Sequence, residues 1–465
     1  MTGRPIPTVS GMEVAREVLV RGLSTGSEVG TPEHDIVRWR IGRRVSIGLG
    51  HPDYVDHVLH EGADRYHKSI EYELLRAVVG LSLFTDEDES WRRYRQMLAP
   101  VMSKRHLRGL GDLMIDPIER FVATLDTGAT RTPVEMSQAM TALTLDVVGA
   151  ALFGQEMGSL AERIGPTVTS ALHAAEFGAR LMTIFDPPTW MARTAVGAIR
   201  HAPWLPPPVD RPQRAMRIIE RTVAETIEHR RTHPSDSPDL LGLLLSASDE
   251  QGALTPRRVR DEATTFMLAG HETTANALTW MWYLLALNPD ARELMLAEVD
   301  AALENGRRPT IADVERLPWT TACFQEAMRV MPPAWVIPRR CVQEDEIDGY
   351  RIPRGATVFV PIHGIHHDPR FWPDPDVYDP ARFLPENAKG QHRSAYLPFG
   401  GGRRICIGSS FALMEGTLIT AMMSQAFVYD LVPGHPVEPE ATLTLRPRRG
   451  VKMVARRRTR VAVAA

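Results

Sequence analysis

The sequence predicts a mainly α-helical (α+β) domain with small β-sheets near both ends of the chain. Residues 37–50 and 347–363 alternate apolar and polar side chains and contain turn-forming residues, a pattern typical of hairpins. Most of the chain between them has the spacing of helices. No internal repeat or low-complexity linker divides the 465 residues. We therefore expect a single domain over 1–465, with an N-terminal extension over about 1–30 and a basic tail over about 453–465.

The composition argues against several classes of protein. A formal net charge of −3 gives no electrostatic reason to bind nucleic acid, and a hydrophobic fraction of 43% is ordinary for a soluble globular protein. Cys323, Cys341 and Cys406 are too few and too scattered for a disulfide framework. The first thirty residues hold no apolar run like that of a signal peptide, and no uncharged apolar stretch reaches membrane-spanning length. These features favour a cytoplasmic protein without a nucleic-acid partner or a membrane span.

The clearest helix covers residues 255–288. Thr255 suits the N-cap, Pro256 suits the first helical position, and Asn288 precedes the proline that ends the helix. Its middle is apolar on nearly all sides, which is typical of a core helix. Yet this middle contains Gly-His-Glu-Thr-Thr (270–274), where a glycine costs about 1 kcal/mol relative to alanine and dry polar groups are unfavourable. We expect the helix to face something that requires these residues.

Cys406 lies between a glycine-rich turn and a predicted helix, in the stretch FGGGRRICIG (399–408). Unpaired N–H groups and the dipole of that helix favour the thiolate form of a cysteine at this place. The glycines let the backbone pass close to a bulky group, and Arg404 could meet an anionic one. A single thiolate without Cys or His at metal-finger spacing suits haem iron better than zinc or an iron–sulfur cluster. The alternative is a structural cysteine buried in a glycine-rich turn.

This stretch resembles the haem-binding signature of the cytochrome P450s, Phe-x-x-Gly-x-Arg-x-Cys-x-Gly. The matching residues are Phe399, Gly402, Arg404, Cys406 and Gly408. Other motifs resemble landmarks of the family in their expected order: WRRYR with Trp91 and Arg95, AGHETT with Glu272 and Thr273, EAMR with Glu326 and Arg329, and DPARF with Arg382. The resemblance extends from about residue 39 to residue 452. It implies a triangular helical prism that binds haem b between helix 255–288 and the Cys406 loop, with Cys406 as the thiolate ligand of the iron.

The family pattern also implies roles for charged residues. Trp91, Arg95, Arg404 and Lys68 would hold the haem propionates, joined by either Arg339 or Arg340, between which the sequence does not decide. Glu326 and Arg329 could be a routine surface ion pair, but their context is apolar, where an unpaired charge is costly. With Arg382 as third member, they resemble a structural clamp on the haem-binding loop.

By position in the family pattern, the substrate pocket is lined by Phe84, Phe266, Ala269, Thr273, Trp335, Val336 and Ile337. Nearly all of these residues are apolar, which implies a lipophilic substrate such as a fatty acid, terpenoid, steroid or polyketide. RYHKS, SLFTDEDESW and TLDVVGAALFG resemble the bacterial fatty-acid hydroxylase branch and its microsomal-like relatives. The arginine and tyrosine that anchor fatty-acid carboxylates in that branch have no clear match near residues 46–50, which weakens the fatty-acid interpretation.

The resemblance implies a monooxygenase that hydroxylates or epoxidises its substrate with one oxygen atom of O2. Glu272 and Thr273 would supply a proton relay, although Thr273 could instead only bond back to the carbonyl four residues earlier. Because the chain shows no flavin or nicotinamide domain, electrons from NAD(P)H would arrive through a ferredoxin or flavodoxin with its reductase. A peroxygenase that uses hydrogen peroxide and a non-catalytic haem-thiolate sensor or carrier are the alternatives, and neither needs the acid–alcohol pair.

Three further patterns have simpler interpretations. His363, His366, His367 and Asp368 resemble a metal cluster, but the neighbouring prolines and glycine argue against a regular helix there. The arginine-rich end of the chain could bind nucleic acid, although a solvated tail fits a slightly acidic protein better. The proline-rich stretch 185–212 could be an active-site lid or only a stiffened loop.

Basic residues near Cys406 predict a docking surface for the electron donor. These residues are Arg92, Arg93, Lys104, Arg105, Arg108 and Arg403. At 3.6 residues per turn, Arg92 and Arg93 point away from the face that carries Trp91 and Arg95. A basic patch would attract an acidic ferredoxin. The alternative is that these arginines only solvate a helix.

Overall fold

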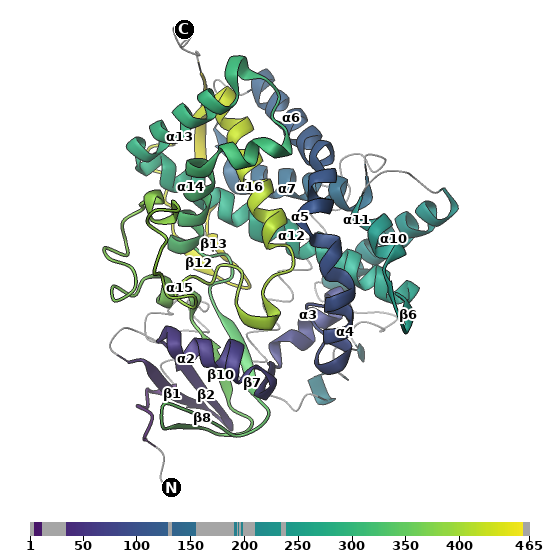
Figure 1. The fold of residues 1–465 in the computed structure, drawn as a ribbon, viewed down its shortest axis with the longest axis vertical. Helices are drawn as coiled ribbons and strands as arrows, with labels where there is room; N and C mark the ends of the chain where they lie inside the picture. The colour runs from purple at the N-terminus through teal and green to yellow at the C-terminus, as the bar shows by residue number, and fades with distance from the viewer. Residues whose placement is uncertain are drawn as a thin grey trace.

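The computed structural model is mainly α-helical with small β-sheets, as the sequence predicts (Figure 1). It describes residues 4–11, 34–128, 133–154, 190–192, 194, 197–198, 210–233 and 239–458. The helices form most of the molecule, and the largest sheet lies at the end where the chain begins (Figure 1). The possible lid at 185–212 and the N-terminal extension fall largely outside the described residues.

The largest sheet has five strands in the order β1, β2, β10, β7 and β3. These strands are Ile36–Ile41, Arg44–Leu49, Thr357–Val360, Ile337–Cys341 and Tyr66–Lys68. β1 and β2 form the hairpin predicted for residues 37–50, β10 joins β2 in parallel, and β7 and β3 follow in antiparallel pairings. The sheet thus joins distant parts of the sequence and brings Lys68 opposite Arg339.

Smaller sheets complete the β-structure of the described residues. One sheet has three strands, in the order β11 (Phe427–Leu431), β14 (Lys452–Arg457) and β4 (Val134–Glu135). Three hairpins have two strands each: β5 with β6 (Ser248–Asp249, Gly252–Ala253), β8 with β9 (Asp345–Ile347, Tyr350–Ile352), and β12 with β13 (Pro439–Ala441, Leu445–Pro447). The sequence predicted a basic tail from about residue 453. Residues 453–457 instead belong to strand β14 and pair with β11. The reason is that Met453 and Ala455 are apolar and buried in this pairing.

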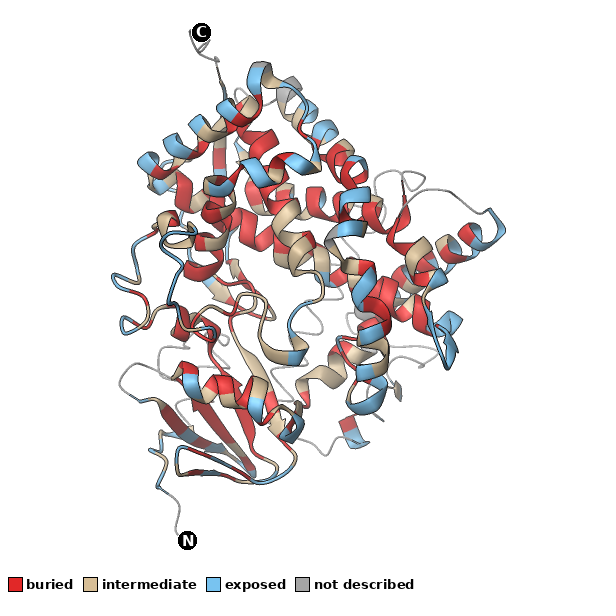
Figure 2. Ribbon diagram, viewed as in Figure 1, coloured by how far each residue is buried: buried red, intermediate tan, exposed pale blue. Residues whose placement is uncertain are grey.

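The helices carry the rest of the fold. They are α2 (Pro52–Asp56), α3 (Glu71–Val79), α4 (Asp88–Leu98), α5 (Lys104–Gly109), α6 (Gly111–Gly128), α7 (Met136–Phe153), α10 (Asp210–Thr232), α11 (Leu240–Ser246), α12 (Pro256–Leu287), α13 (Pro289–Ala302), α14 (Pro318–Val330), α15 (Ile362–His366) and α16 (Ser409–Ala426). Short helical segments used below are η1 (His57–Glu61), η7 (Pro380–Phe383) and η8 (Gly402–Arg404). Buried residues run through the centre of the helical part and exposed residues cover its outer turns (Figure 2).

α12 is the long helix predicted from the sequence. The side chain of Thr255 caps it by accepting the N–H of Arg258 at 3.2 Å, and Asn288 ends it. α12 packs against α7 so closely that a Cβ atom on Gly270 would lie 3.0 Å from Cγ2 of Val148. The glycine in the middle of the helix therefore permits this close approach.

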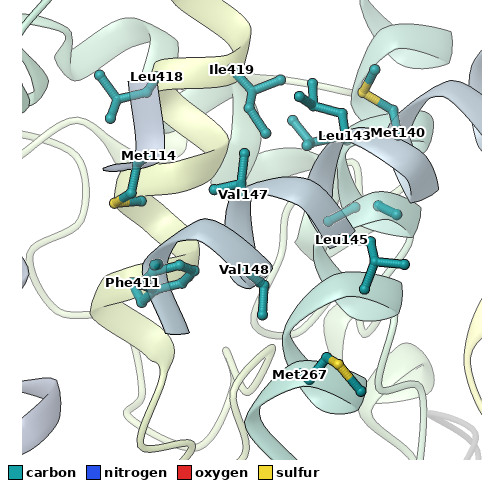
Figure 3. Close-up of a cluster of buried hydrophobic side chains, with 14 of the residues drawn as sticks. Met114, Met140, Leu143, Leu145, Val147, Val148, Met267, Phe411, Leu418 and Ile419 are labelled. Carbon is teal, nitrogen blue, oxygen red and sulfur yellow. The ribbon is translucent and has the colours of Figure 1, made fainter. Parts of the chain in front are cut away.

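α7 is mainly apolar. It is the one helix of the described chain that is long and apolar enough to cross a membrane, and 67% of that segment is buried inside the protein. Figure 3 shows its side chains packed among residues of α6, α12 and α16, such as Met114, Met267 and Phe411. In this structure α7 is a core helix.

Candidate active site

The loop that carries Cys406 is closed by backbone hydrogen bonds. The N–H of Cys406 donates to the carbonyl of Phe399 at 2.9 Å. Gly402 has a φ of +65°, and a Cβ atom on it would lie 1.9 Å from the carbonyl oxygen of Leu59. Glycine is therefore required where the loop passes η1.

Cys406 differs from the other cysteines of the chain. Cys323 and Cys341 are buried, whereas the side chain of Cys406 is accessible. The surrounding chain still encloses the thiol enough that burial raises the pKa of Cys406, while the N–H of Gly408 and the charge of Arg95 oppose this shift. The sequence predicted that the end of the following helix would stabilise the thiolate. The N–H of Gly408 does lower the pKa of Cys406, but burial raises it by more. An accessible sulfur on a rigid loop suits a soft metal ligand.

Lys68 lies beside the segment that precedes α4. Its Nζ donates to the carbonyl of Leu83 at 3.1 Å and to that of Phe84, and its backbone N–H donates to the carboxylate of Glu87 at 2.7 Å. Burial lowers the pKa of Lys68 well below its ordinary value, and the positive charge of Arg404 adds to this effect. Lys68 thus lies in an environment that already holds the positive charge of Arg404.

Arg404 is half-buried and lies over the indole ring of Trp91, with its guanidinium carbon 4.2 Å from the ring centroid. It donates to the carbonyl of Asp86 at 3.1 Å and pairs with Glu87. Burial lowers the pKa of Arg404, the charge of Arg339 lowers it further, and Glu87 acts in the opposite direction. Glu87 is the carboxylate that pairs with Arg404, and the charges of Asp86 and Asp88 also act on this group of cations.

The geometry favours Arg339 over Arg340 as the additional member of this cation group. Arg339 is 7% exposed, and it lines the same cavity of about 110 Å³ as Trp91 and Arg404. Its guanidinium donates to the hydroxyl of Tyr72 at 3.4 Å. Adjacent residues of a strand point to opposite faces, and Arg340 accordingly lies near Gly355.

α12 presents one accessible face in the middle of an otherwise buried helix. Phe266 and Thr273 are half-buried and Ala269 is exposed, whereas most of the neighbouring residues of α12 are buried. Their spacing of three and four residues places them on one face of the helix. The hydroxyl of Thr273 donates to the carbonyl of Ala269 at 2.8 Å. This bond is the one that the alternative interpretation of Thr273 predicted, and it leaves the oxygen of the hydroxyl able to accept.

The other predicted pocket residues differ in exposure and in the residues that they contact. Phe84 is 38% exposed, and Ile337 faces the Cys406 loop, since a Cβ on Gly400 would lie 3.4 Å from its Cδ1 atom. Val336 is half-buried and packs against two apolar clusters, that of Trp39 and Phe359 and that of Trp335. Trp335, in contrast, is buried in a separate apolar cluster with Ala441 and Leu445, where its large ring is better shielded from water.

Sequence reasoning missed a buried group of charges that holds the segment before α4. Arg258 of α12 binds Asp86 at 2.6 Å and Glu262 at 2.8 Å. Glu262 also accepts the backbone N–H of Leu83 at 2.9 Å. Burial raises the pKa of Glu262 to about 7, as does the charge of Asp86, while Arg258 and the N–H of Leu83 oppose the shift. The signal was the run of charges in RRVRDEATT, at the start of an otherwise apolar helix.

The predicted ionic triad is assembled and buried. Arg329 donates two hydrogen bonds to Glu326, at 2.8 and 2.9 Å, and both side chains are 0% exposed. Arg382 of η7 lies 3.6 Å from the same carboxylate. Arg329 also donates to the carbonyl of His366 at 2.8 Å. The geometry is that of a structural clamp between α14 and the segments that lead to the Cys406 loop.

The predicted basic patch is largely neutralised by carboxylates, so this prediction is wrong as stated. Four of its arginines are ion-paired: Arg92 and Arg403 with Asp64, Arg93 with Asp249, and Arg108 with Glu315. The partners come from segments that are distant in sequence. The surface is therefore one of mixed charge.

The histidine motif near α15 has structural contacts. The two ring nitrogens of His366 bond to the backbone carbonyl of Arg329 at 3.1 Å and to the N–H of Leu397 at 2.8 Å. Burial lowers the pKa of His366 well below its ordinary value. The ring of His363 stacks on that of His367. These contacts account for the buried histidine and for the stacked pair.

Comparisons with known proteins identify this arrangement. The profile of the cytochrome P450 family matches residues 31–454. The chain belongs to the cytochrome P450 family. Cytochrome P450 132 of Mycobacterium bovis, whose name gives a family and no substrate, is 50% identical over 464 residues, which cover 98% of this chain and 97% of that protein. Cyclooctatin synthase of Streptomyces melanosporofaciens is 34% identical over 418 residues, which cover 89% of this chain and 87% of that protein.

A solved structure agrees with this assignment. The crystal structure of the cytochrome P450DA haem domain has a TM-score of 0.85 to this P450 at 27% sequence identity, and the match covers 99% of this chain and 98% of that chain. The predicted P450 fold is confirmed, and the chain is an oxidoreductase of the haem-dependent monooxygenase class.

The residues around Cys406 fit a haem. Arg95 is half-buried, burial lowers its pKa, and among the described residues it has no hydrogen-bond or carboxylate partner. The charges of Arg404 and Arg339 lower the pKa of Lys68, and the charge of Arg339 also lowers the pKa of Arg404. Arg95 lies one turn along α4 from Trp91, which Arg404 covers. A molecule with two carboxylates would offer these cations counter-charges. The accessible thiol of Cys406 lies within reach of the charge of Arg95. A soft iron ligand beside cations for propionates matches the chemistry of this cofactor.

Proposed function

We propose that this P450 oxidises a lipophilic small molecule with O2 and receives its electrons from separate donor proteins. The observation that carries the proposal is the accessible thiol of Cys406 near the charge of Arg95, on the loop that also carries the half-buried Arg404. Such a site serves a haem-thiolate cofactor better than a structural role, because a structural cysteine is normally buried in apolar surroundings.

The cofactor of the proposal is haem b. Cys406 would bind its iron, and Arg95, Arg339, Arg404 and Lys68 would hold its propionates, with Trp91 beneath Arg404. When bound, the haem activates O2 so that one oxygen atom enters a C–H or C=C bond and the other leaves as water. Phe399, Gly402 and Gly408 shape the loop that presents Cys406.

Glu272 and Thr273 are proposed to handle the protons. Glu272 is half-buried and can hold a proton on its carboxyl group near the centre of α12. The hydroxyl of Thr273 donates to the carbonyl of Ala269, so its oxygen can accept a hydrogen bond from water on the accessible face of the helix. Because adjacent residues of a helix do not face each other, the relay between the acid and the hydroxyl would run through water.

The substrate is proposed to be lipophilic, as in a terpenoid, steroid, polyketide or fatty acid. The residues that would line its pocket are apolar: Phe84, Phe266, Ala269, Val336 and Ile337. A relative is named cyclooctatin synthase, which is consistent with oxidation of a small molecule in this part of the family. None of these five side chains carries a charge that could anchor a carboxylate.

The electron donor is proposed to be a ferredoxin or flavodoxin that is reduced by NAD(P)H through its reductase, with the whole system in the cytoplasm. Because most of the predicted basic patch is paired with carboxylates, docking would use mixed charges rather than a uniform basic surface.

The deciding experiment compares two ways of driving turnover. The purified holoenzyme is first screened with lipophilic compounds for a shift in the spin state of the haem spectrum. Compounds that bind are then tested for product with NADPH, ferredoxin, reductase and O2, and separately with hydrogen peroxide. The proposal expects product with the electron donors and little with peroxide. Product with peroxide alone would indicate a peroxygenase, and binding without product in either assay would indicate a sensor or carrier.

A further inference from the structure

Thr444 is hydrogen-bonded to Glu272 across a large distance in sequence. It lies in the turn 442–444 between β12 and β13, and its Oγ1 donates to Oε1 of Glu272 at 2.7 Å. The same hydroxyl oxygen accepts from Nδ2 of Asn276 at 3.1 Å. Thr444 and Asn276 are 5% and 7% exposed, so this chain of hydrogen bonds is shielded from bulk water.

The direction of the chain is fixed by its chemistry. The amide nitrogen of Asn276 can only donate, which leaves the single proton of the Thr444 hydroxyl to point at Glu272. Asn276 and Glu272 are four residues apart, so they lie one helical turn apart on the same face of α12. In a shielded environment, hydrogen bonds in such a chain strengthen one another.

The turn that carries Thr444 is itself anchored. The indole N–H of Trp280 donates to the carbonyl of Leu445 at 3.0 Å, and the indole N–H of Trp335 donates to the carbonyl of Thr442 at 3.0 Å. Within the turn, the hydroxyl of Thr442 donates to the carbonyl of Thr444 at 2.9 Å. Trp335 therefore contributes to the site by holding this turn, although it does so from a buried cluster.

We propose that Thr444 is a positioning residue that holds the carboxyl group of Glu272 for proton delivery. The inference rests on the proposed role of Glu272 in this P450. Without the Thr444 hydroxyl, the Glu272 side chain would sample additional rotamers, and its proton would be delivered from several positions instead of one. The hairpin β12–β13 is thus a support for the acid as well as a part of the fold.

The test uses the holoenzyme with a plant-type ferredoxin, its reductase and NADPH, without added substrate. The rate of O2 consumption is measured in H2O and D2O for Thr444→Val, Thr444→Ser and Glu272→Gln. Thr279→Val is the matched control, because Thr279 is a buried threonine of α12 whose hydroxyl donates to the carbonyl of Ala275 at 2.7 Å. We expect Thr444→Val to lower the rate about tenfold and to raise the solvent isotope effect. Thr444→Ser should stay within about twofold of the unmodified enzyme, and the control should not change.

A second readout does not depend on turnover. The carboxyl stretching band of Glu272 is assigned in the infrared spectrum by its loss in Glu272→Gln. It should shift in Thr444→Val and keep its position in Thr444→Ser. Asn276→Ala, which removes the donor to Thr444, should shift the band in the same direction by a smaller amount, and it serves if Thr444→Val does not fold.

The outcomes separate this inference from the proposed function. If Glu272→Gln changes neither the rate nor the isotope effect, the proposed role of Glu272 fails and the inference fails with it. If Glu272→Gln slows the enzyme but removal of the Thr444 hydroxyl neither slows it nor shifts the band, the inference is wrong and the proposed function stands. A Thr444→Ser variant as slow as Thr444→Val would assign the effect to packing, which also overturns the inference.

Discussion

Arg258 binds Asp86 through a 2.6 Å ion pair that joins the first turn of α12 to the segment before α4. The same segment offers the carbonyls of Leu83 and Asp86 to Lys68 and Arg404, two of the cations beside Cys406. The pair thus links the start of the long helix to the proposed propionate site. The link cannot be inferred from the charges of α12 alone, or from the cations beside Cys406 alone.

Arg258→Ala should destabilise the fold by about 3–5 kcal/mol, because it leaves the carboxylate of Asp86 buried without its partner. The free energy of unfolding is measured with urea, together with the haem content of the purified protein, which should also fall. Arg257→Ala is the matched control, since the Arg257 side chain is 77% exposed and lies 3.9 Å from Asp261. A similar loss in both variants would show that the buried pair has no special role.

Glu262 should make stability depend on pH. Its pKa is raised by burial to about 7, so the folded state binds a proton more tightly than the unfolded state. The stabilisation is complete below the ordinary glutamate pKa and is lost as pH rises through about 7, by up to about 3 kcal/mol. In Glu262→Gln, the free energy of unfolding should no longer show this decrease between about pH 4.5 and pH 8. The control is Glu293→Gln, because Glu293 is exposed on α13, and this variant should keep the pH profile of the unmodified protein. Identical profiles for the unmodified protein, Glu262→Gln and Glu293→Gln would refute the role of Glu262.

Arg329→Ala should be among the most damaging substitutions. It would leave Glu326 buried with the more distant Arg382, at 3.6 Å, as its nearest cation and the N–H of Asp379, at 3.0 Å, as a donor. It would also remove the bond to the carbonyl of His366. We expect a loss of about 3–5 kcal/mol in the free energy of unfolding. Arg351→Ala breaks an exposed pair with Glu344 and should cost less than about 1 kcal/mol. Equal thermal stability of the two variants would contradict a clamp at Glu326.

Gly402→Ala should abolish haem retention while leaving most of the helical structure intact. A Cβ atom at this position would lie 1.9 Å from the carbonyl oxygen of Leu59, so the Cys406 loop would have to move. Gly390→Ala is the control, because Gly390 also has a positive φ, of +87°, but a Cβ there would have no neighbour within 4 Å. Gly390→Ala should cost about 1 kcal/mol through backbone strain alone. Full haem content in Gly402→Ala would show that the loop tolerates the movement.

Features with local causes were predictable from the sequence. The ends of α12 follow from Thr255, Pro256 and Asn288, and the hairpin β1–β2 follows from alternation within residues 37–50. Cys406, Arg404 and the triad residues carry strong motifs. The strand at 452–457 was not predicted, because its pairing with β11 depends on tertiary contacts rather than on its arginine-rich composition.

The failures share one physical cause, which is that partners distant in sequence leave no local signal. Arg93 pairs with Asp249 and Arg108 with Glu315, so a run of basic residues did not become a basic patch. Thr444 reaches Glu272 over 172 residues. The ring of Trp335, a pocket residue by its position in the family pattern, is buried with Ala441 and Leu445, which are also distant in sequence.

The central claim is that Cys406 is the thiolate ligand of the haem iron. It is tested most directly by the absorption spectrum of the reduced carbon monoxide complex of Cys406→Ser, beside Cys341→Ser as a control at a buried cysteine. The account predicts that Cys406→Ser loses the red-shifted band that thiolate ligation produces, since a serine oxygen is a poorer donor to iron. Cys341→Ser should keep the band. An unchanged band in Cys406→Ser would contradict the account and place the ligand elsewhere in the chain.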